Sequence, residues 1–309
     1  GGYCNGWNFG FNRIKEIVRC LVDANIDIIE CGFLTSKVKY KKDVSKFTTL
    51  DEVKEVIPKE KKGKMYVCLL NYGEYNIDDI PICQNDSLDG IRVAFHKKDI
   101  NEALEFCKRL KEKKYKVFVQ PMVSLSYSDE EFLDLIRKVN KIKPYAFYIV
   151  DSFGAMKSKD LIRLFYNVEH NLEMHIHVGY HSHNNMQLAY SNAQTLVSIQ
   201  TKRKLIIDAS IFGMGRGAGN LNTELFVEYL NETESTHYKL KPILLVVDKI
   251  LNRFYQQNYW GYSLPNYLSA SHNVHPNYAT YLNDKQTLTV EDMDAIFTMM
   301  QNDKKNNFN

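Results

Sequence analysis

The chain has 309 residues, of which 44% are hydrophobic and 25% are charged, and its formal net charge is +3. This length allows one large α/β domain or two smaller ones. The composition is typical of a soluble globular protein. No basic stripe interleaves with aromatic residues, which argues against nucleic-acid binding, and no apolar run reaches the length of a membrane span.

Six cysteines lie at positions 4, 20, 31, 68, 83 and 107, and none of them forms a Cys-x-x-Cys pair. This pattern argues against a disulfide framework and against a zinc knuckle. It is typical of small buried hydrophobic residues. Because no signal peptide is recognisable, we expect the protein to work in a reducing cytoplasm.

In chain order, the sequence repeats a short apolar strand, a polar turn and an amphipathic helix. We expect strands over residues 26–31, 64–70, 90–95, 116–121, 146–150, 175–180 and 205–208. We expect helices over residues 11–24, 100–113, 129–141, 158–169 and 186–199. Alternating strands and helices predict a parallel sheet, and continuous apolar strands are typical of burial on both faces.

After residue 220 the alternation gives way to helices, expected over residues 223–231, 242–258 and 290–300. Residues 259–283 are aromatic and rich in turn-forming residues, and the tail 303–309 is polar and expected to fray. We therefore divide the chain into a catalytic domain, 1–231, and a helical C-terminal extension, 232–309. The extension is expected to pack on the first domain or on a partner subunit.

Seven strands are one fewer than a closed (β/α)8 barrel needs. The first recognisable element is a helix, and the chain begins at Gly1 without an initiator methionine, as if inside a motif. We therefore expect an α/β fold of the TIM-barrel type whose first strand is missing from the sequence. An open, doubly wound sheet is the alternative. The barrel is favoured because polar residues follow many strand ends, where a barrel places its active site.

Two histidines, His181 and His183, stand two residues apart at the end of an expected strand. Side chains alternate along a strand, so both rings point the same way and could hold one metal ion from one side. The alternative is that they only hydrogen-bond to their neighbours. Imidazole with oxygen ligands suits Mn, Co, Zn or Fe better than Ca. A carboxylate and open positions for substrate would still be needed.

A glycine-rich loop runs from Gly213 to Asn220, with glycine at every second position up to Gly219. It lacks the Lys-Ser/Thr pair of a phosphate-binding loop and the Gly-x-Gly-x-x-Gly spacing of a dinucleotide site. It is either a flexible connector or a tight turn that brings its backbone close to a ligand and aims Asn220 inward.

Further polar residues stand at strand ends. A buried acid is costly unless it is paired, so Glu30, Arg92 and Asp151 could form a network in the barrel mouth or a purely structural ring of ion pairs. For Asp208 we favour a structural role. The other polar residues at strand ends are Asn71, His96, Gln120 and Ser152.

With these motifs in view, residues 1–231 resemble the metal-dependent aldolase and lyase superfamily. This superfamily contains 4-hydroxy-2-oxovalerate aldolase, 3-hydroxy-3-methylglutaryl-CoA lyase and isopropylmalate synthase. The most specific matches are the segments 151–154, 181–185 and 208–220. The last is most similar to the 4-hydroxy-2-oxovalerate aldolase branch. It particularly resembles bacterial proteins with an aldolase catalytic domain, whose helical C-terminal region is similar to this one.

The resemblance implies roles for particular residues. His181 and His183 would be metal ligands, and Asn220 would be a further ligand or a substrate contact. Ser152 would hydrogen-bond the substrate oxyanion, and Glu30 would lie near the metal. The expected catalytic residues are Ser152, Glu30, Arg92 and Tyr3. The residues expected to contact substrate are Asp151, Gly217 and Gly219.

Two departures from the family pattern concern the N-terminus. The first strand of the family ends in Arg-Asp-Gly, whose Asp binds metal and whose Arg stabilises the enolate. Gly1 matches that Gly, so the Arg and Asp would lie just before the sequence begins. Tyr3 stands where the aldolases carry a histidine general base. The proton carrier is therefore open between Tyr3, His96 and a tyrosine of the extension such as Tyr267 or Tyr281.

We therefore expect a divalent-metal-dependent aldolase or carbon–carbon lyase that acts on a small 2-oxo acid through a pyruvate enolate. Mn²⁺ is the favoured cofactor, with Mg²⁺, Co²⁺ or Zn²⁺ as alternatives. Two alternatives stay open. The protein could be an acyl-CoA condensing enzyme or lyase of the same superfamily, or a non-catalytic barrel that serves as a binding subunit. We expect a homodimer with no membrane or nucleic-acid partner; a dehydrogenase partner, as in the aldolase branch, is conceivable.

Overall fold

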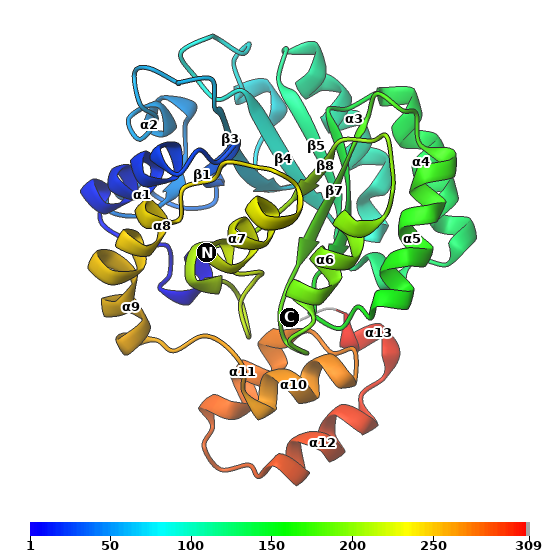
Figure 1. Cartoon of the computed structure of the whole chain (residues 1–309). Helices are drawn as coiled ribbons and strands as arrows, with labels where there is room; N and C mark the ends of the chain where they lie inside the picture. The colour runs from blue at the N-terminus through cyan, green and yellow to red at the C-terminus, as the bar shows by residue number, and fades with distance from the viewer. Residues whose placement is uncertain (307–309) are drawn as a thin grey trace.

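Parallel strands form one curled sheet of eight in the computed structural model, which describes residues 1–306 (Figure 1). Their order is β2-β1-β3-β4-β5-β6-β7-β8. From β3 onward each strand pairs with the next one along the chain, as in a barrel. The order reverses only at β1, whose partner β2 is two residues long. A doubly wound sheet carries helices on both faces, whereas one face of this sheet encloses a cluster of its own side chains, so the curled, barrel-like arrangement is supported. The strands are β1 (Ile28–Leu34), β2 (Lys46–Phe47), β3 (Met65–Asn71), β4 (Gly90–Phe95), β5 (Lys116–Pro121), β6 (Ala146–Asp151), β7 (His177–Ser182) and β8 (Leu205–Ile207).

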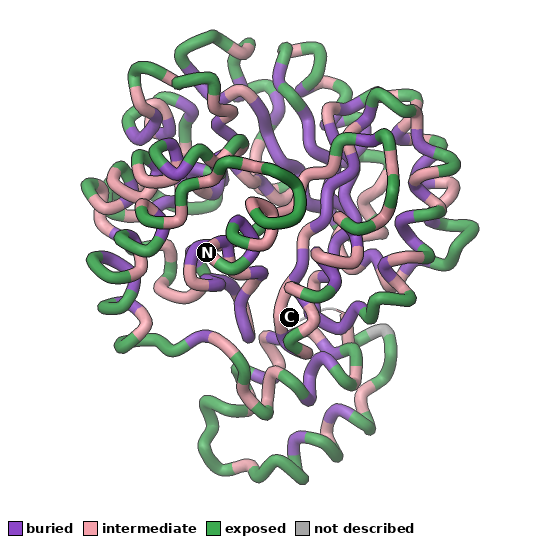
Figure 2. The backbone as a smooth tube through the Cα atoms, viewed as in Figure 1, coloured by how far each residue is buried: buried purple, intermediate pink, exposed green. Residues whose placement is uncertain are grey.

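The central strands are buried on both faces, which explains why they are continuous apolar runs. Every residue of β4 and β6 is buried, and Figure 2 shows the buried backbone concentrated in the strands. One set of side chains, with Val67, Phe118 and Tyr148 among its members, forms a small inner cluster. The opposite set faces the helices and joins the main core. In β4, Ile91 and Val93 face the helices and belong to the main core. Arg92 lies between them in the chain, so its buried side chain points to the inner face of the sheet.

Helices cover the outer face of the sheet (Figure 1). Local capping fixes several of their starts: Ser128 accepts a hydrogen bond from the backbone N–H of Glu131, whose carboxylate accepts one in return from Ser128 N–H. This reciprocal pair is a capping box, and it explains why α4 begins at Asp129. The helices of this layer are α1 (Phe11–Asp23), α2 (Leu50–Lys54), α3 (Ile100–Glu112), α4 (Asp129–Ile142), α5 (Ser158–Asn171), α6 (Ala189–Ser198) and α7 (Thr223–Thr233).

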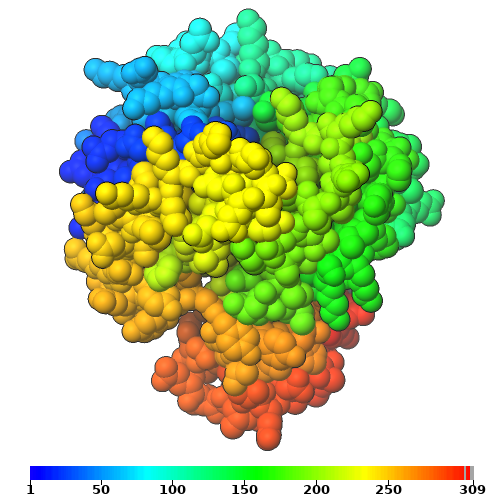
Figure 3. All heavy atoms as spheres, viewed as in Figure 1, coloured from blue at the N-terminus to red at the C-terminus, as the bar shows by residue number. Residues whose placement is uncertain are grey.

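The C-terminal region divides into two parts. Helix α8 (Leu240–Val246), a π-helical turn (Val247–Leu251) and α9 (Asn252–Gln257) supply Ile243, Leu251 and Phe254 to the main core. The later helices share a separate apolar core that includes Val274 and Phe297, and they form a distinct lobe in the space-filling view (Figure 3). These are α10 (Leu264–Ser271), α11 (Pro276–Asp284), α12 (Val290–Met299) and α13 (Asn302–Lys305). Within the part of the chain that is described, no helix is both long and apolar enough to cross a membrane.

The sheet ends in two edges. β2 pairs with β1 at Phe33 and Leu34 only, and β8 pairs with β7 alone. Among the strands of residues 1–306, none joins β8 to β1 or β2. Gly1 lies against Met214 and Ser210, which follow β8 in the chain. The N-terminus therefore stands beside the open side of the sheet.

All seven expected strands are present, and the expected helices are confirmed with small shifts at their ends. Two differences stand out. β2 and α2 were not expected, because two and five residues are too few to give a periodic pattern. Within the helical extension, residues 259–283 were expected to be rich in turns, whereas they contain α10 and most of α11. In both helices the proline stands in the first turn, where its missing N–H costs nothing. Residues 307–309 of the expected polar tail lie outside the described part.

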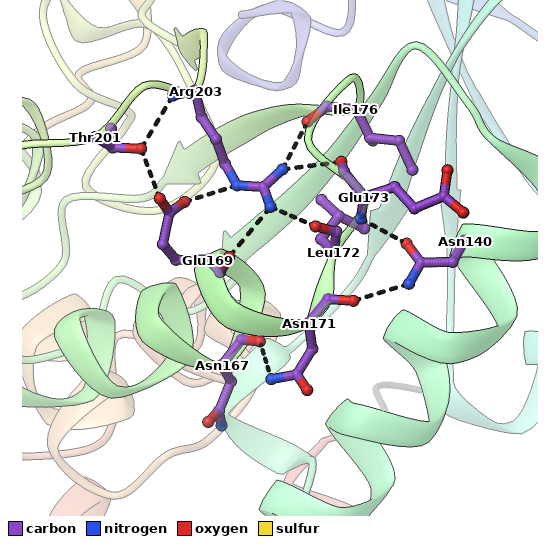
Figure 4. A network of polar contacts seen from close by, with 9 residues as sticks. All are labelled: Asn140, Asn167, Glu169, Asn171, Leu172, Glu173, Ile176, Thr201 and Arg203. Carbon is purple, nitrogen blue, oxygen red and sulfur yellow. Dashed lines mark hydrogen bonds and ion pairs between the residues drawn. The ribbon is translucent and has the colours of Figure 1, made fainter.

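A buried arginine ties the N-terminal side of the barrel together (Figure 4). The Arg203 side chain is 1% exposed, and its Nε donates to Glu169 Oε2 at 2.6 Å. Its other nitrogens donate to backbone carbonyls at the end of α5 and in the following turn: those of Glu169, Leu172, Glu173 and Ile176. Carbonyls at the end of a helix lack partners within the helix, so one guanidinium closes α5 and anchors the approach to β8.

Candidate active site

The two histidines stand together at the carboxyl end of β7, as expected. His181 belongs to the strand and His183 follows it directly, where the backbone N–H of His183 donates to Asp151 O at 3.1 Å. The strand pairing with β6 thus continues past the end of β7 and keeps the two side chains on one face. Their ring centroids are 5.4 Å apart, with an angle of 73° between the rings.

A second partner orients each imidazole. His181 Nδ1 lies 2.9 Å from Asp208 Oδ2, and His183 Nδ1 lies 3.2 Å from the backbone oxygen of Arg216. Both partners are acceptors, so each Nδ1 carries a proton and each Nε2 keeps a lone pair. This is the arrangement of metal-binding histidines. Burial holds the pKa of His183 well below its ordinary value, and the charge of Arg216 lowers it further, so this ring is neutral.

Asp208 is the centre of a polar network inside the barrel. Its carboxylate forms an ion pair with Arg92, and its Oδ1 accepts a hydrogen bond from the Tyr148 hydroxyl at 3.1 Å. Arg92 Nη1 also donates to Glu30 Oε2 at 2.6 Å. Burial raises the pKa of Asp208, but Arg92 and His181 outweigh it and hold this pKa below its ordinary value. An ionised Asp208 can therefore accept a hydrogen bond from the Nδ1–H of His181.

The expected network of Glu30, Arg92 and Asp151 is only partly correct. Glu30 and Arg92 are in contact, but the second acid on Arg92 is Asp208. The Asp151 carboxylate accepts instead from the backbone N–H groups of Ala155 and Met156 at 3.0 and 3.1 Å, so it closes the loop after β6. Burial raises its pKa to about 6, against the lowering effect of these N–H groups.

Ser152 has a similar local partner. Its hydroxyl oxygen accepts a hydrogen bond from the backbone N–H of Val123 at 2.8 Å. This bond joins the loop after β6 to the loop after β5. The contacts of Ser152 with substrate stay a prediction.

The glycine loop folds back onto the end of β7. Asn184 N–H donates to Gly219 O at 2.9 Å, and Asn185 Oδ1 accepts from Ala218 N–H at 3.1 Å. Gly217 and Gly219 have φ values of 62° and 86°. A Cβ on Gly219 would collide with the backbone oxygen of Gly213, and one on Gly217 would press on the Asn185 amide. These glycines are needed for the tight turn; their contact with substrate stays a prediction.

Asn220 offers a further donor beside the histidines. Its backbone forms a bridge with His183, and its Nδ2 donates to Met214 O at 2.9 Å. Its Oδ1 is buried and has no hydrogen-bond partner. Two imidazole nitrogens and this amide oxygen fit a divalent transition-metal ion. The set is incomplete, since the described residues contain no group of three or more His, Cys, Asp or Glu side chains able to hold a metal.

The rim of the site joins Tyr3, a residue expected from the sequence, to Arg216 and His275, which sequence reasoning missed. Tyr3 is 43% exposed, and the Arg216 guanidinium lies 4.1 Å from the centroid of its ring. Arg216 Nη1 in turn lies 3.3 Å from His275 Nε2. Arg216 could have been noticed, because it is the charged residue of the glycine loop. His275 is the cap of α11, 59 residues further on, and no local pattern marks it.

The C-terminal extension lies over this end of the barrel. Asn185 Nδ2 donates to Asn266 O at 3.3 Å, and Trp260 Nε1 donates to Phe212 O at 2.8 Å. The rings of Phe153 and His275 meet edge to face at 5.6 Å. Helix α10 and the turn before α11 therefore contact the loops after β6, β7 and β8 (Figure 1).

Comparison with known proteins identifies the group to which this geometry belongs. A family model described as HMGL-like matches residues 1–250. The chain belongs to the HMGL-like family. The expected resemblance to the aldolase and lyase superfamily is thereby confirmed.

Similar proteins include a 4-hydroxy-2-oxovalerate aldolase from Geobacillus thermodenitrificans, 26% identical over 235 residues. The match covers 75% of this HMGL-like chain and 66% of the aldolase, just under two thirds of its length. Among solved structures, the N-terminal domain of a candidate aldolase from Bacteroides vulgatus has a TM-score of 0.80 and 25% identity over 96% of each chain. A hydroxymethylglutaryl-CoA lyase from Pseudomonas aeruginosa has a TM-score of 0.61 at 16% identity, over 78% of this chain and 86% of that one, and shows the shared fold alone.

Proposed function

We propose that this HMGL-like protein is a divalent-metal-dependent carbon–carbon lyase of the aldolase type that acts on a small 2-oxo acid. The observation that carries the proposal is the pair His181 and His183, each with its Nδ1 fixed by another acceptor and its Nε2 left for a ligand. The names of the related proteins support the reaction class.

His181 and His183 through Nε2, and Asn220 through Oδ1, would hold the ion, with Mn²⁺ favoured and Mg²⁺, Co²⁺ or Zn²⁺ as alternatives. When bound, such an ion supplies Lewis-acid polarisation of the 2-oxo acid and stabilises the enolate that bond cleavage leaves. The chain contributes orientation: Arg92, held between Glu30 and Asp208, keeps the Asp208 carboxylate against His181.

Substrate contacts follow from the loops around the histidines. Ser152, Asp151, Gly217 and Gly219 border the same end of the barrel, and we assign the substrate to the space beside them. Tyr3 stands at the rim under Arg216, where its hydroxyl is a candidate to move a proton to or from the departing oxygen.

A closed (β/α)8 barrel is part of the proposal. Seven of the eight strands, β1 and β3–β8, are the expected barrel strands, while β2 is two residues long and pairs only with the end of β1. One more strand on the open side between β8 and β1 would therefore complete a barrel of eight. The Arg-Asp pair of the family motif would directly precede Gly1, which lies against Met214 of the glycine loop. An Asp there would add the carboxylate that the two histidines and Asn220 lack.

Association with a second copy stays a prediction. Tyr259 and Tyr262 are exposed on the segment between α9 and α10, and these aromatic side chains are the best candidates for a homodimer contact. Light scattering of the wild type and of a Tyr259→Ser, Tyr262→Ser double variant would test it. A monomeric wild type would contradict it.

Exchange of the pyruvate methyl protons for deuterium, followed by NMR, tests the proposed function. The protein is measured with the family's Arg-Asp segment joined ahead of Gly1, with Mn²⁺ and with a chelator. We expect exchange that requires the metal and is lost in His181→Ala. His177→Ala is the matched control, because His177 lies at the other end of β7, stacked on Tyr145, and should exchange normally.

The failures separate the alternatives. No exchange in a folded protein that binds Mn²⁺ would rule out a pyruvate enolate and point to acyl-CoA substrates. Neither exchange nor metal binding would point to a non-catalytic barrel.

A further inference from the structure

Arg216 stands beside the paired histidines without an acidic partner. Its backbone oxygen is the acceptor for His183 Nδ1, so its side chain begins next to the metal-ligand pair. No ion pair among the described residues includes Arg216 or the arginines Arg13, Arg19 and Arg253, but of these four only Arg216 stands beside the paired histidines. The paired arginines are Arg92, Arg109, Arg137, Arg163 and Arg203. A half-buried guanidinium without a counter-charge is a site that an anion would stabilise.

The hydrogen-bond donors of Arg216 are largely unused. Nη1 faces His275 Nε2, and Nε is buried with no hydrogen-bond partner in residues 1–306. A guanidinium carries five N–H donors in a planar fork. A buried donor is expensive to leave without an acceptor. Nε is closed to solvent, so the donors left for an acceptor from outside are those on the terminal nitrogens Nη1 and Nη2, of which one faces His275.

Two neighbours fix where the fork points. The ring of Tyr3 lies under the guanidinium at 4.1 Å, and His275 reaches it from the turn before α11. Burial lowers the pKa of His275 to about 4 and also lowers that of His96, and the charge of Arg216 adds to both effects. Both imidazoles are neutral near pH 7, so His275 can accept from Arg216 and Arg216 supplies the full charge of this corner.

We infer that Arg216 binds the second carboxylate of a dicarboxylic 2-oxo acid whose 2-oxo end lies at His181 and His183. The inference rests on the proposed function and narrows its substrate class. One guanidinium with neutral neighbours matches the single charge and two coplanar oxygens of a carboxylate. Tyr3 and His275 act as positioning residues, so the C-terminal extension takes part in selecting the substrate.

Isothermal titration tests the inference with three probes: pyruvate, 2-oxoglutarate and glutarate. All three probes are measured with Mn²⁺, and the glutarate titration is repeated with a chelator in place of Mn²⁺. We expect the wild type to bind 2-oxoglutarate about 10- to 100-fold more tightly than pyruvate, the range expected for a charge-assisted pair of hydrogen bonds. In Arg216→Gln the ratio should fall to about 1. Arg253→Gln is the matched control, because Arg253 is exposed on α9 and should keep the preference.

Arg216→Lys keeps the charge but not the fork, and it serves as the second variant if Arg216→Gln does not fold. We expect it to lose most of the preference. His275→Gln keeps an acceptor for Arg216 and should keep the preference, whereas His275→Leu should weaken 2-oxoglutarate binding and leave pyruvate binding unchanged.

The inference and the proposed function can fail separately. If pyruvate shows no metal-dependent binding while glutarate binds the wild type and not Arg216→Gln, the proposed function fails and the carboxylate site stands. A wild type that binds neither dicarboxylate overturns the inference. So does a folded Arg216→Gln protein that keeps the preference for 2-oxoglutarate.

Discussion

Replacing Arg203 with methionine should strongly destabilise the protein, although Arg203 lies far from the site. The change removes an ion pair with Glu169 at 2.6 Å and leaves the carbonyls at the end of α5 without their common donor. Methionine fills much of the same volume, so the loss is mainly electrostatic. Breaking a fully buried pair by removing one partner typically costs about 3–5 kcal/mol. The Glu169 side chain is 21% exposed, so water can partly solvate the charge that is left, and we expect a loss of about 2–4 kcal/mol.

Urea unfolding followed by circular dichroism measures this loss. Arg137→Met is the control, because the Arg137 side chain is 64% exposed and its contact with Asp134 is 3.5 Å long; such a pair is worth about 0–1 kcal/mol. The double variant Arg203→Met, Glu169→Gln removes both charges and should recover about 1–3 kcal/mol relative to the sum of the single changes. A loss for Arg203→Met no larger than that for Arg137→Met would refute the reasoning.

Three further predictions concern the site. Asp208→Asn should weaken Mn²⁺ binding about 10- to 100-fold by titration, because His181 loses the carboxylate on Nδ1; unchanged affinity would contradict that role. Gly219→Ala should lower the unfolding midpoint and metal affinity together, since its Cβ would collide with Gly213 O, whereas a wild-type midpoint would show that the loop adapts. The pKa of His275 is lowered to about 4 in the folded protein, so as the pH falls this histidine is protonated in the unfolded chain before it is protonated in the folded one. The wild type should therefore lose stability relative to His275→Gln as the pH falls from about 6.5 to 4, and parallel pH profiles would count against it.

The strands were predictable because their signal is local. Each is a short apolar run with both faces buried, and β4 and β6 are the clearest cases. The histidine pair was predictable for the same reason, since strand alternation places His181 and His183 on one face wherever the strand lies. Helices α10 and α11 were missed because a proline in the first turn of a helix gives that segment the local composition of a turn.

The partners of the site residues were less predictable. A structural role was favoured for Asp208, and that role stays a prediction; its contacts with His181, Arg92 and Tyr148, which come from three other strands, were not predicted. Such contacts depend on how far the sheet curls and on the register between strands, and no single segment encodes either. Asp151 was expected in this network, but nearby backbone N–H groups satisfy its carboxylate first. His275 comes from a lobe whose docking the sequence does not reveal.

The separate apolar core of α10–α12 has an evolutionary consequence. Val274, Ala279 and Phe297 hold these helices to one another, whereas His275 and Asn266 face the barrel. The residues that maintain the lobe are thus different from those that border the site. Mutations at the facing positions can accumulate without unfolding the lobe, so one barrel with a fixed pair of histidines could be diversified toward new substrates by changing the helices that cover it.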